Sequence, residues 1–203
     1  MNEKTNQETW SKNVILVDAD YIDRVAFDLI VNFERMLGRR ILQADLAHWI
    51  DCVALDGGMQ PSPTPSQEGG DCQVIFLHTK RKLENFVPGD YARDLDGKAF
   101  SDNLGEFCIS CVQVEELTTM ESLFCESLQH VCQQPGVERL MVIADEQYID
   151  AVIRSVPGRC SSTLTVFTMQ PLPGGRFMQQ ILGFSLMAAL GIQSAEIEES
   201  TNK

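Results

Sequence analysis

Two apolar segments of the chain each end at a pair of carboxylates, and residues of this type in this order are suited to chemistry on phosphate esters. The first pair is Asp18 and Asp20, and the second pair is Asp145 and Glu146. A further acid, Glu121, stands at the start of a helical pattern that precedes the second segment. Carboxylate oxygens select Mg²⁺ or Mn²⁺, and either ion holds a phosphate and activates a water molecule for its hydrolysis. The acids therefore indicate metal-assisted hydrolysis.

These carboxylates can meet only if the segments before them are neighbouring strands of a parallel sheet. Residues 14–17 and the segment 139–144, which is apolar from Leu140 onward, are continuous apolar runs of the kind typical of strands buried on both faces. Neighbouring parallel strands lie about 5 Å apart, and ligands bind at the carboxyl edge of open α/β sheets. We therefore expect Asp18 and Asp145 to lie close together at one edge.

Amphipathic helical patterns separate the apolar segments. The first predicted helix runs from Ile22 to Gly38, and the second runs from about Asp45 to Gly57. The remaining elements that we predict are strands at 72–78, 105–114 and 163–169, a helix at 120–132 opened by a capping box at 118–121, a helix through 149–153, and an almost wholly apolar helix at 177–190. This alternation predicts an α/β fold: a three-layer, Rossmann-like sandwich around a mostly parallel sheet of about five strands.

A basic cluster, Lys80, Arg81 and Lys82, follows the predicted strand 72–78. If that strand is parallel to the first, the cluster lies on the same sheet edge as Asp18 and is placed to bind phosphate. The alternative is a solvated loop after a strand. Neither of the usual nucleotide-binding glycine motifs, G-x-G-x-x-G after the first strand or G-x-x-x-x-G-K, is found in the sequence.

The chain length of 203 residues predicts one domain, and the odd number of cysteines without a secretion signal predicts a reducing compartment. We expect a flexible N-terminus at 1–12, a single domain at 13–192 and a flexible acidic tail at 193–203. The polar start of the chain lacks the apolar core of a signal peptide, and no apolar run is long enough to cross a bilayer. The seven cysteines are expected to be free thiols. These features predict a cytoplasmic protein with no membrane partner.

Two internal segments carry turn signals instead of a hydrophobic period. Residues 60–70 are rich in proline, serine and glycine and predict an exposed, mobile loop. Residues 83–103 contain turn signals and have room for a short helix. The net charge of −13 also bears on function, because so acidic a chain repels a phosphate backbone at long range.

The order of elements and acids resembles the PIN-like superfamily, and especially its NYN branch. Asp18 matches the aspartate of the family's first motif, D-x-x-N, but Tyr21 stands where the asparagine is expected. Glu121 keeps an acid at the central helical motif, and Asp145 matches the first aspartate of the late motif S-G-D-x-D-F, in which Gln147 replaces the second. The resemblance implies a metal-dependent ribonuclease.

The resemblance also implies a role for each candidate residue in cleaving RNA. The metal, Mg²⁺ or Mn²⁺, would be held by Asp18, Glu121 and Asp145, and the attacking water would be oriented by Asp20 or Glu146. The RNA phosphate would be bound by the basic cluster Lys80, Arg81 and Lys82. As a whole the chain also resembles an uncharacterised bacterial family of unknown function, in residues 17–21, 55–58 and 182–192.

Two other interpretations of the same residues remain open. Asp18, Asp20 and Asp145 stand at strand-to-helix turns, where aspartate is common simply because it caps helices. The substitutions at Tyr21 and Gln147, together with the negative charge, favour a catalytically inactive protein-interaction or regulatory module. The apolar helix predicted at the end of the chain then serves either as a core element or as an interface with a protein partner or a second copy.

Overall fold

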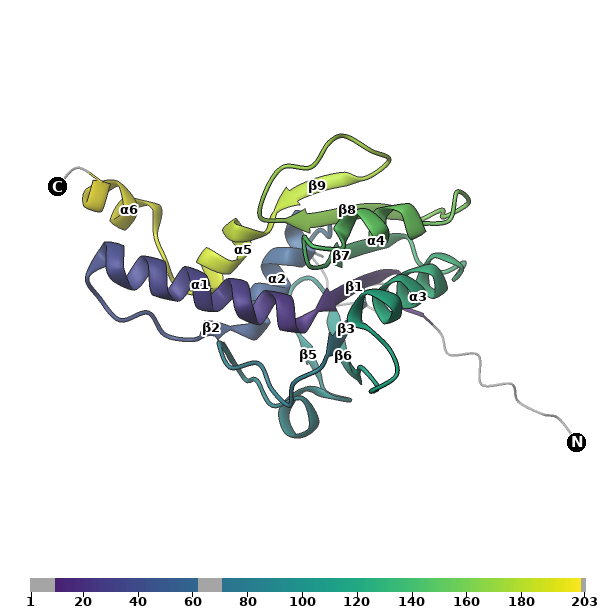
Figure 1. The fold of residues 1–203 in the computed structure, drawn as a ribbon, viewed down its shortest axis with the longest axis horizontal. Helices are drawn as coiled ribbons and strands as arrows, with labels where there is room; N and C mark the ends of the chain where they lie inside the picture. The colour runs from purple at the N-terminus through teal and green to yellow at the C-terminus, as the bar shows by residue number, and fades with distance from the viewer. Residues whose placement is uncertain (1–9, 62–70, 202–203) are drawn as a thin grey trace, which may run out of the picture.

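The structure is a computed structural model that describes residues 10–61 and 71–201 of the chain (Figure 1). Its middle layer is a seven-stranded sheet in which every neighbouring pair is parallel except the first, which is antiparallel. Across the sheet the strands are β5 (Ala99–Ser101), β6 (Glu106–Gln113), β3 (Cys72–His78), β1 (Asn13–Asp18), β7 (Arg139–Ile143), β8 (Thr163–Thr168) and β9 (Met178–Ile181). The mostly parallel sheet is confirmed, with seven strands where about five were predicted.

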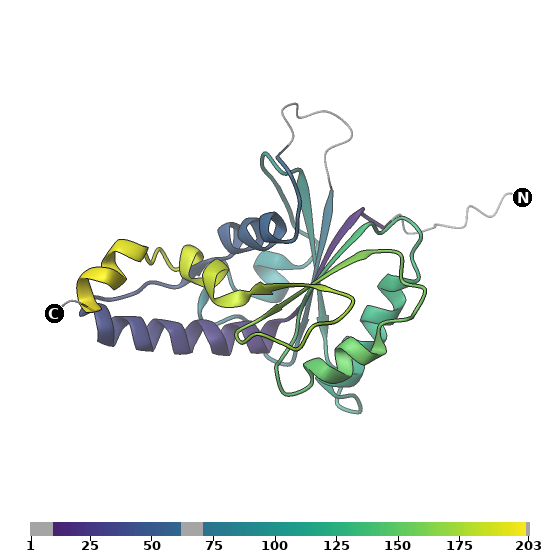
Figure 2. The ribbon, with the colours of Figure 1, turned by 90° about the horizontal axis from the view of Figure 1, so that it is seen from above.

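Helices cover both faces of the sheet, as Figure 2 shows with the sheet seen almost edge-on. One face carries α1 (Ala19–Leu37), α2 (Leu46–Asp56) and α5 (Leu182–Ala189), and the other carries α3 (Met120–Cys132) and α4 (Ile149–Ser155). A last helix, α6 (Ser194–Thr201), lies beside α1. A small second sheet pairs β2 (Ala44–Asp45) with β4 (Phe86–Val87), and a short helical turn, η1 (Tyr91–Leu95), follows it.

The central strand β1 shows why the sheet needs two helical layers. Ile15 and Val17 belong to the core beneath α1, α2 and α5, whereas Val14 and Leu16 belong to the core beneath α3 and α4. All four side chains are fully buried. Successive side chains of a strand point to opposite faces, so a continuous apolar run buries both faces of the sheet. The prediction of a doubly buried first strand is confirmed.

Helix α1 follows β1 without an intervening loop. Asp18 ends the strand and caps the helix, with its Oδ1 accepting a hydrogen bond from the Tyr21 amide at 3.0 Å. The helix ends at Gly38, as predicted, because φ is +64° there and the Gly38 amide donates to the Glu34 carbonyl. The second predicted helix is also confirmed, and Asp45 caps it.

The single helix predicted at 177–190 is wrong in its first part. Met178–Ile181 form β9, which pairs with β8 in parallel, and the helix α5 begins only at Leu182. Gln179 donates from Nε2 to Thr168 Oγ1 at 2.9 Å, which helps to hold the strand against β8. The apolar character of the segment did not distinguish a strand from a helix, because both elements are apolar where they meet the core.

Two further details of the predicted elements need correction. The capping residue of α3 is Thr119 and not Thr118, because Thr119 Oγ1 accepts from the Ser122 amide at 3.2 Å. The second is the segment 83–103, which contains the short helix for which the sequence left room, as η1, but also β4 and the short strand β5, which adds the antiparallel edge of the sheet.

The ends of the predicted domain have ordered contacts. In the tail expected to be flexible, α6 is tied to the end of α1, since Arg39 Nε lies 2.8 Å from Glu196 Oε1 and Arg39 Nη2 lies 2.9 Å from Oε2. Trp10 packs edge-on against His130, with ring centroids 5.6 Å apart. The rest of the predicted N-terminal segment, at 1–9, and most of the predicted loop, at 62–70, lie outside the described residues. Within the described ranges, no helix combines the length and apolarity that a membrane span requires.

Candidate functional site

The candidate site lies where β1 and β7 end side by side. The chain proceeds outward from β1 to β3 and β6, then returns to β7 on the other side of β1 and proceeds outward through β8 and β9. Ligands of open α/β sheets bind outside the carboxyl ends of the strands at such a reversal. Val17 is paired with Ile143 in parallel register, so the acids after both strands share one edge. The expectation that these two strands are parallel neighbours is confirmed.

Asp18 is buried at this edge and both of its carboxylate oxygens are engaged. Asp18 is only 3% exposed. Oδ1 accepts from the Tyr21 amide at 3.0 Å, and Oδ2 accepts from the Tyr148 hydroxyl at 2.5 Å. Burial raises the pKa of Asp18, an effect that the two hydrogen bonds oppose and the nearby charges of Asp20 and Asp145 reinforce.

Asp145 is engaged in the same way, by a cation and a backbone amide. Its Oδ2 lies 2.8 Å from Nη2 of Arg24 on α1, and its Oδ1 accepts from the Gln147 amide at 2.9 Å. Asp145 is 8% exposed, whereas the Arg24 side chain is 50% exposed. The hydrogen bond to Asp145 raises the pKa of Arg24. The pair therefore joins the end of β7 to the first turns of α1.

The two residues predicted to orient water make structural contacts. Asp20 Oδ2 accepts hydrogen bonds from the amide, at 3.0 Å, and from the hydroxyl of Thr79, which directly follows β3. Its Oδ1 is buried and has no hydrogen-bond partner among the residues described. Glu146 Oε1 accepts from the Met169 amide at 3.0 Å and so ties the ends of β7 and β8 together.

Glu121 is near this edge but is solvent-exposed. It lies in the first turn of α3, one turn before Phe124, whose ring packs edge-on against Tyr148 with centroids 6.1 Å apart. Within the described part of the chain, no hydrogen bond or ion pair joins Glu121 to Asp18 or Asp145.

The basic cluster does lie on the predicted edge, because β3 is parallel to β1. Lys80 Nζ is 3.7 Å from Asp23 Oδ2, and Lys82 Nζ is 2.9 Å from Glu84 Oε2. Arg81 is exposed and, in the described ranges, makes no ion pair. Two of the three cations therefore already have carboxylate partners, although both lysine side chains remain more than half exposed.

The donor set does not form a ready-made site for Mg²⁺ or Mn²⁺. Across residues 10–61 and 71–201, no group of three or more His, Cys, Asp or Glu side chains is arranged to hold a metal ion. Asp18 and Asp145 converge, but a cation between them would have to displace the Tyr148 hydroxyl or the Arg24 guanidinium. The acids as they stand connect strand ends to helices.

Comparison with known proteins gives a family and no activity. A model of DUF6621, a family of unknown function, matches residues 7–197. The chain belongs to this family. No curated protein matches the chain, and no solved structure matches it. The DUF6621 match confirms the predicted likeness to an uncharacterised family and gives no support to the PIN-like resemblance or to a bacterial origin.

Sequence reasoning missed the partners of the two central acids in this DUF6621 member. Arg24 had a signal, because it lies one helical turn after Asp20 and therefore on the side of α1 that starts at the sheet edge. Tyr148 had only a weak signal, since the position of an aromatic residue three places after Asp145 does not determine the direction in which its side chain points. At this sheet edge Asp18 and Asp145 thus form a network with Tyr148 and Arg24 and are not free carboxylates.

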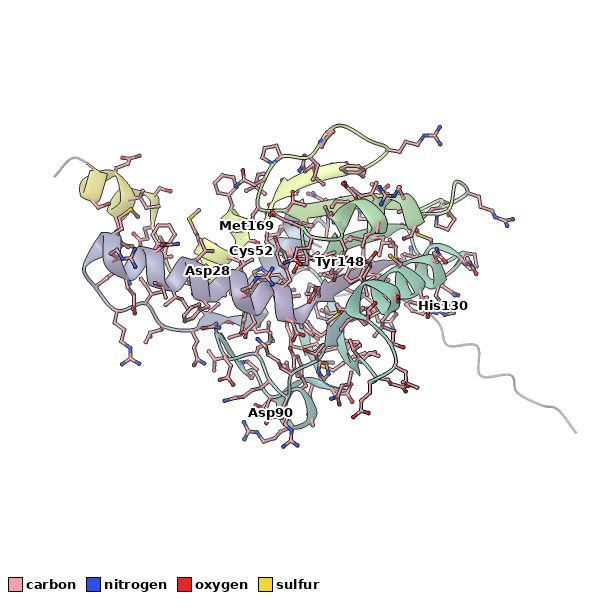
Figure 3. The ribbon with its side chains drawn as sticks, in the orientation of Figure 1. Asp28, Cys52, Asp90, His130, Tyr148 and Met169 are labelled. Carbon is pink, nitrogen blue, oxygen red and sulfur yellow. The ribbon has the colours of Figure 1, made fainter. Side chains whose placement is uncertain are left out.

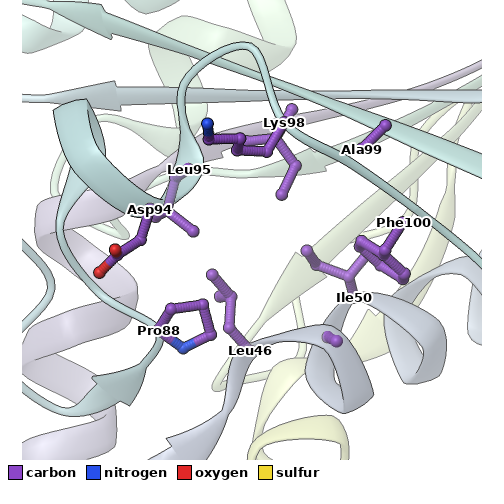
Figure 4. A pocket seen from close by; sticks show the side chains of 10 residues that line it. Leu46, Ile50, Pro88, Asp94, Leu95, Lys98, Ala99 and Phe100 are labelled. Atoms are coloured by element: carbon purple, nitrogen blue, oxygen red, sulfur yellow. The ribbon is translucent and has the colours of Figure 1, made fainter.

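A separate cavity in this DUF6621 member, shown in Figure 4, lies between α2, η1 and β5, away from these acids. Its volume is about 180 Å³, and its walls are mostly apolar, with Leu46, Ile50, Leu95 and Phe100 among them. A cavity with so few polar groups can accommodate an apolar shape but has little means of orienting a reacting group.

Proposed function

We propose that this chain is a catalytically inactive interaction or regulatory module, in which the central acids hold the sheet edge together. The observation that carries the proposal is the complete engagement of Asp18 and Asp145. Each of these buried carboxylates has one oxygen on a backbone amide and the other on a side-chain donor, Tyr148 or Arg24.

The energetics of the edge support this proposal. Removing a partner from a buried carboxylate leaves an uncompensated group, which costs more than the pair gains by forming. A metal ion at Asp18 would also have to replace the Tyr21 amide or the Tyr148 hydroxyl as the partner of a carboxylate oxygen. The net charge of −13 further opposes long-range attraction of RNA.

The arrangement of the strands supports a Rossmann-like classification within this proposal. Numbered in chain order, the six parallel strands lie across the sheet as 3-2-1-4-5-6, which is the order of Rossmann-type doubly wound sheets. The direct junction of β1 and α1 leaves no glycine-rich turn for a pyrophosphate, so we do not assign a dinucleotide to the module. We place it in the cytoplasm, because all seven cysteines are free, as is usual in a reducing compartment.

A second candidate function is a PIN/NYN-like, metal-dependent phosphodiesterase that cleaves RNA with Mg²⁺ or Mn²⁺. Two observations favour it: Asp18 and Asp145 follow adjacent parallel strands, and Asp20 Oδ1 is buried without a partner among the described residues. It requires the roles that the resemblance implies for the acids and for the basic cluster.

Calorimetric titration of the full chain with MnCl₂ separates the two functions. The inactive module predicts no saturable heat up to millimolar Mn²⁺ and no cleavage of a fluorescent single-stranded RNA. Micromolar binding that Asp18→Asn abolishes, together with Mn²⁺-dependent cleavage, would overturn the module and establish the enzyme.

A further inference from the structure

A groove runs along α1 on the side that faces the segments after β7 and β8. We call it the α1 groove. Its volume is about 280 Å³, and the residues that line it include Tyr21, Val25, Asp28, Leu29, Glu146 and Met169. Figure 3 labels Asp28 and Met169, which line this groove from α1 and from the segment after β8. Asp28 and Glu146 are exposed, so the groove is open to solvent beside the switch between β1 and β7.

A buried hydroxyl in this groove lacks a partner. Tyr21 is 3% exposed, and its hydroxyl oxygen makes no hydrogen bond to any residue that the structure describes. Buried hydroxyls in proteins nearly always have a hydrogen-bond partner. Burial, followed by the charges of Glu146 and Asp145, raises the pKa of Tyr21, so the group remains a neutral hydroxyl that can accept or donate a hydrogen bond. We take the hydroxyl without a partner among the described residues as an indication that a ligand binds in the groove.

The charged residues that line the groove determine whether it attracts a positive or a negative ligand. The Asp28 side chain makes no hydrogen bond or ion pair within the described ranges, and Glu146 uses only Oε1, on the Met169 amide. The one cation of the groove, Arg24, is already paired with Asp145. Arg24 neutralises only Asp145, so the carboxylates of Asp28 and Glu146 have no compensating cation among the residues that line the groove. The acidic protein as a whole adds to the attraction for a positive charge.

The apolar part of the groove indicates the shape of the ligand. Val25 and Leu29 contribute aliphatic surface from α1, and Met169 contributes a flexible thioether from the opposite wall. Long cationic side chains commonly lay an alkyl stem along such a surface and keep the charged head among polar groups.

We propose that the α1 groove binds an alkylammonium or alkylguanidinium cation, with its stem along Val25, Leu29 and Met169 and its head at the carboxylates of Asp28 and Glu146. The Tyr21 hydroxyl accepts a further hydrogen bond from the head. The cation is either a free aliphatic amine or the side chain of a lysine or arginine on a partner protein. This inference names the ligand chemistry of the proposed interaction module and rests on that proposal.

The test is calorimetric titration of the full chain with Nα-acetyl-lysine methylamide and with its Nε-acetylated form, which keeps the stem and loses the charge. We expect the charged probe to bind about tenfold more tightly, because a charge-assisted hydrogen bond contributes about that factor. Asp28→Asn and Glu146→Gln should each weaken binding of the charged probe by about fivefold. Neither variant should make this binding more sensitive to salt than it is in the wild type. Tyr21→Phe should weaken it by a smaller factor.

The matched control is Asp150→Asn, which removes the same charge from an exposed position on α4, on the opposite face of the sheet. Its affinity for the charged probe should stay close to that of the wild type. Equal binding of the two probes, or equal losses in Asp28→Asn and Asp150→Asn, would overturn the proposal. Circular dichroism melting of each variant confirms that a loss of binding is not a loss of fold.

Two further titrations identify the source of the cation and separate this inference from the proposed function. If 1,5-diaminopentane binds as tightly as a lysine-containing tripeptide, the site takes a free amine; if the peptide binds about tenfold more tightly, it takes a side chain. If no cationic probe binds and the Mn²⁺ titration also gives no saturable heat, this inference is wrong and the proposed function stands. Saturable Mn²⁺ binding removes the proposed function itself.

Discussion

Two groups of carboxylates flank α1, and they differ in what surrounds them. Asp18 and Asp145 are buried and have partners on both oxygens, whereas Asp28 and Glu146 are exposed and keep free acceptor oxygens toward the α1 groove. Buried charges need protein partners, because they have lost water, and exposed charges do not. The contrast shows that burial separates these acids: Asp18 and Asp145 use both oxygens within the protein, whereas Asp28 and Glu146 keep oxygens that a ligand can reach.

The largest expected effect comes from breaking the Arg24–Asp145 pair. Arg24→Met should lower the free energy of unfolding by about 2 kcal/mol, which is less than for a fully buried pair because solvent screens the half-exposed guanidinium. Urea unfolding measures this change. Adding Asp145→Asn should restore part of the loss, since position 145 then no longer holds a buried charge without its partner.

Arg93→Met provides the matched control for Arg24→Met. Arg93 pairs with its neighbour Asp94 at the surface, and its side chain is 76% exposed. Losing this pair should change the unfolding midpoint very little. If Arg24→Met were equally harmless, the edge acids would not depend on their partners and the comparison between the two groups would fail.

The next largest effect concerns the Tyr148 hydroxyl, which donates a hydrogen bond to Asp18. Tyr148→Phe keeps the ring contact with Phe124 and removes only the bond to Asp18, so it should cost about 1–2 kcal/mol in urea unfolding. Tyr91→Phe removes a hydroxyl that is also buried but has no partner among the described residues, and it should be neutral or stabilising. Equal losses in the two variants would contradict the role of the Asp18 bond.

A third group of carboxylates sharpens the comparison, because it is half-buried without a cation. Burial raises the pKa of Asp51 on α2 from 3.8 to about 7, and a hydrogen bond donated by protonated Asp51 to Asp102 and the charge of Asp102 act in the same direction. Folded Asp51 therefore holds a proton that the unfolded chain has released, so the free energy of unfolding should fall as the pH rises from about 4 to about 7.

Urea unfolding at several pH values checks this pH dependence. Asp51→Asn should flatten the dependence in that range, because the amide does not titrate. The exposed acid at Asp150 offers the comparison, and Asp150→Asn should leave the slope as in the wild type. An unchanged slope in Asp51→Asn would show that the two facing carboxylates do not share a proton.

The smallest effects are expected at the exposed acids. Asp28→Asn and Glu121→Gln should each change the free energy of unfolding by no more than about 0.5 kcal/mol, because neither side chain is buried. Thermal melting checks both. A large loss at Asp28 would mean that it holds α1 in place and would move it into the structural group.

Most of the sheet was predictable because its strands are long, apolar and separated by amphipathic helices. Those patterns located β1 and β7 and the shared edge at which Asp18 and Asp145 meet. The strands β5 and β9 were missed since each is short and takes its pairing from a neighbour, β6 or β8.

The positions of the central acids were predictable, but their state was not. Arg24 is 121 residues from Asp145 in the sequence, and Tyr148 is 130 residues from Asp18. The helical spacing placed Arg24 on the side of α1 that starts at the sheet edge, but no local pattern indicates that Arg24 or Tyr148 reaches its acid across such a separation. The sequence therefore could not show whether the carboxylates were free or occupied. The α1 groove was missed for the same reason, because its two walls come from α1 and from the segments that follow β7 and β8.

The direct passage from β1 into α1 at Asp18 makes the helix intolerant of insertions. Each added residue would advance the helix by about 100° of rotation, since an α-helix has 3.6 residues per turn. A single residue inserted after Asp18 would thus turn the groove-lining side of α1 away from Met169 and carry Arg24 away from Asp145. Among DUF6621 sequences, gaps should be tolerated in surface loops and excluded from this junction.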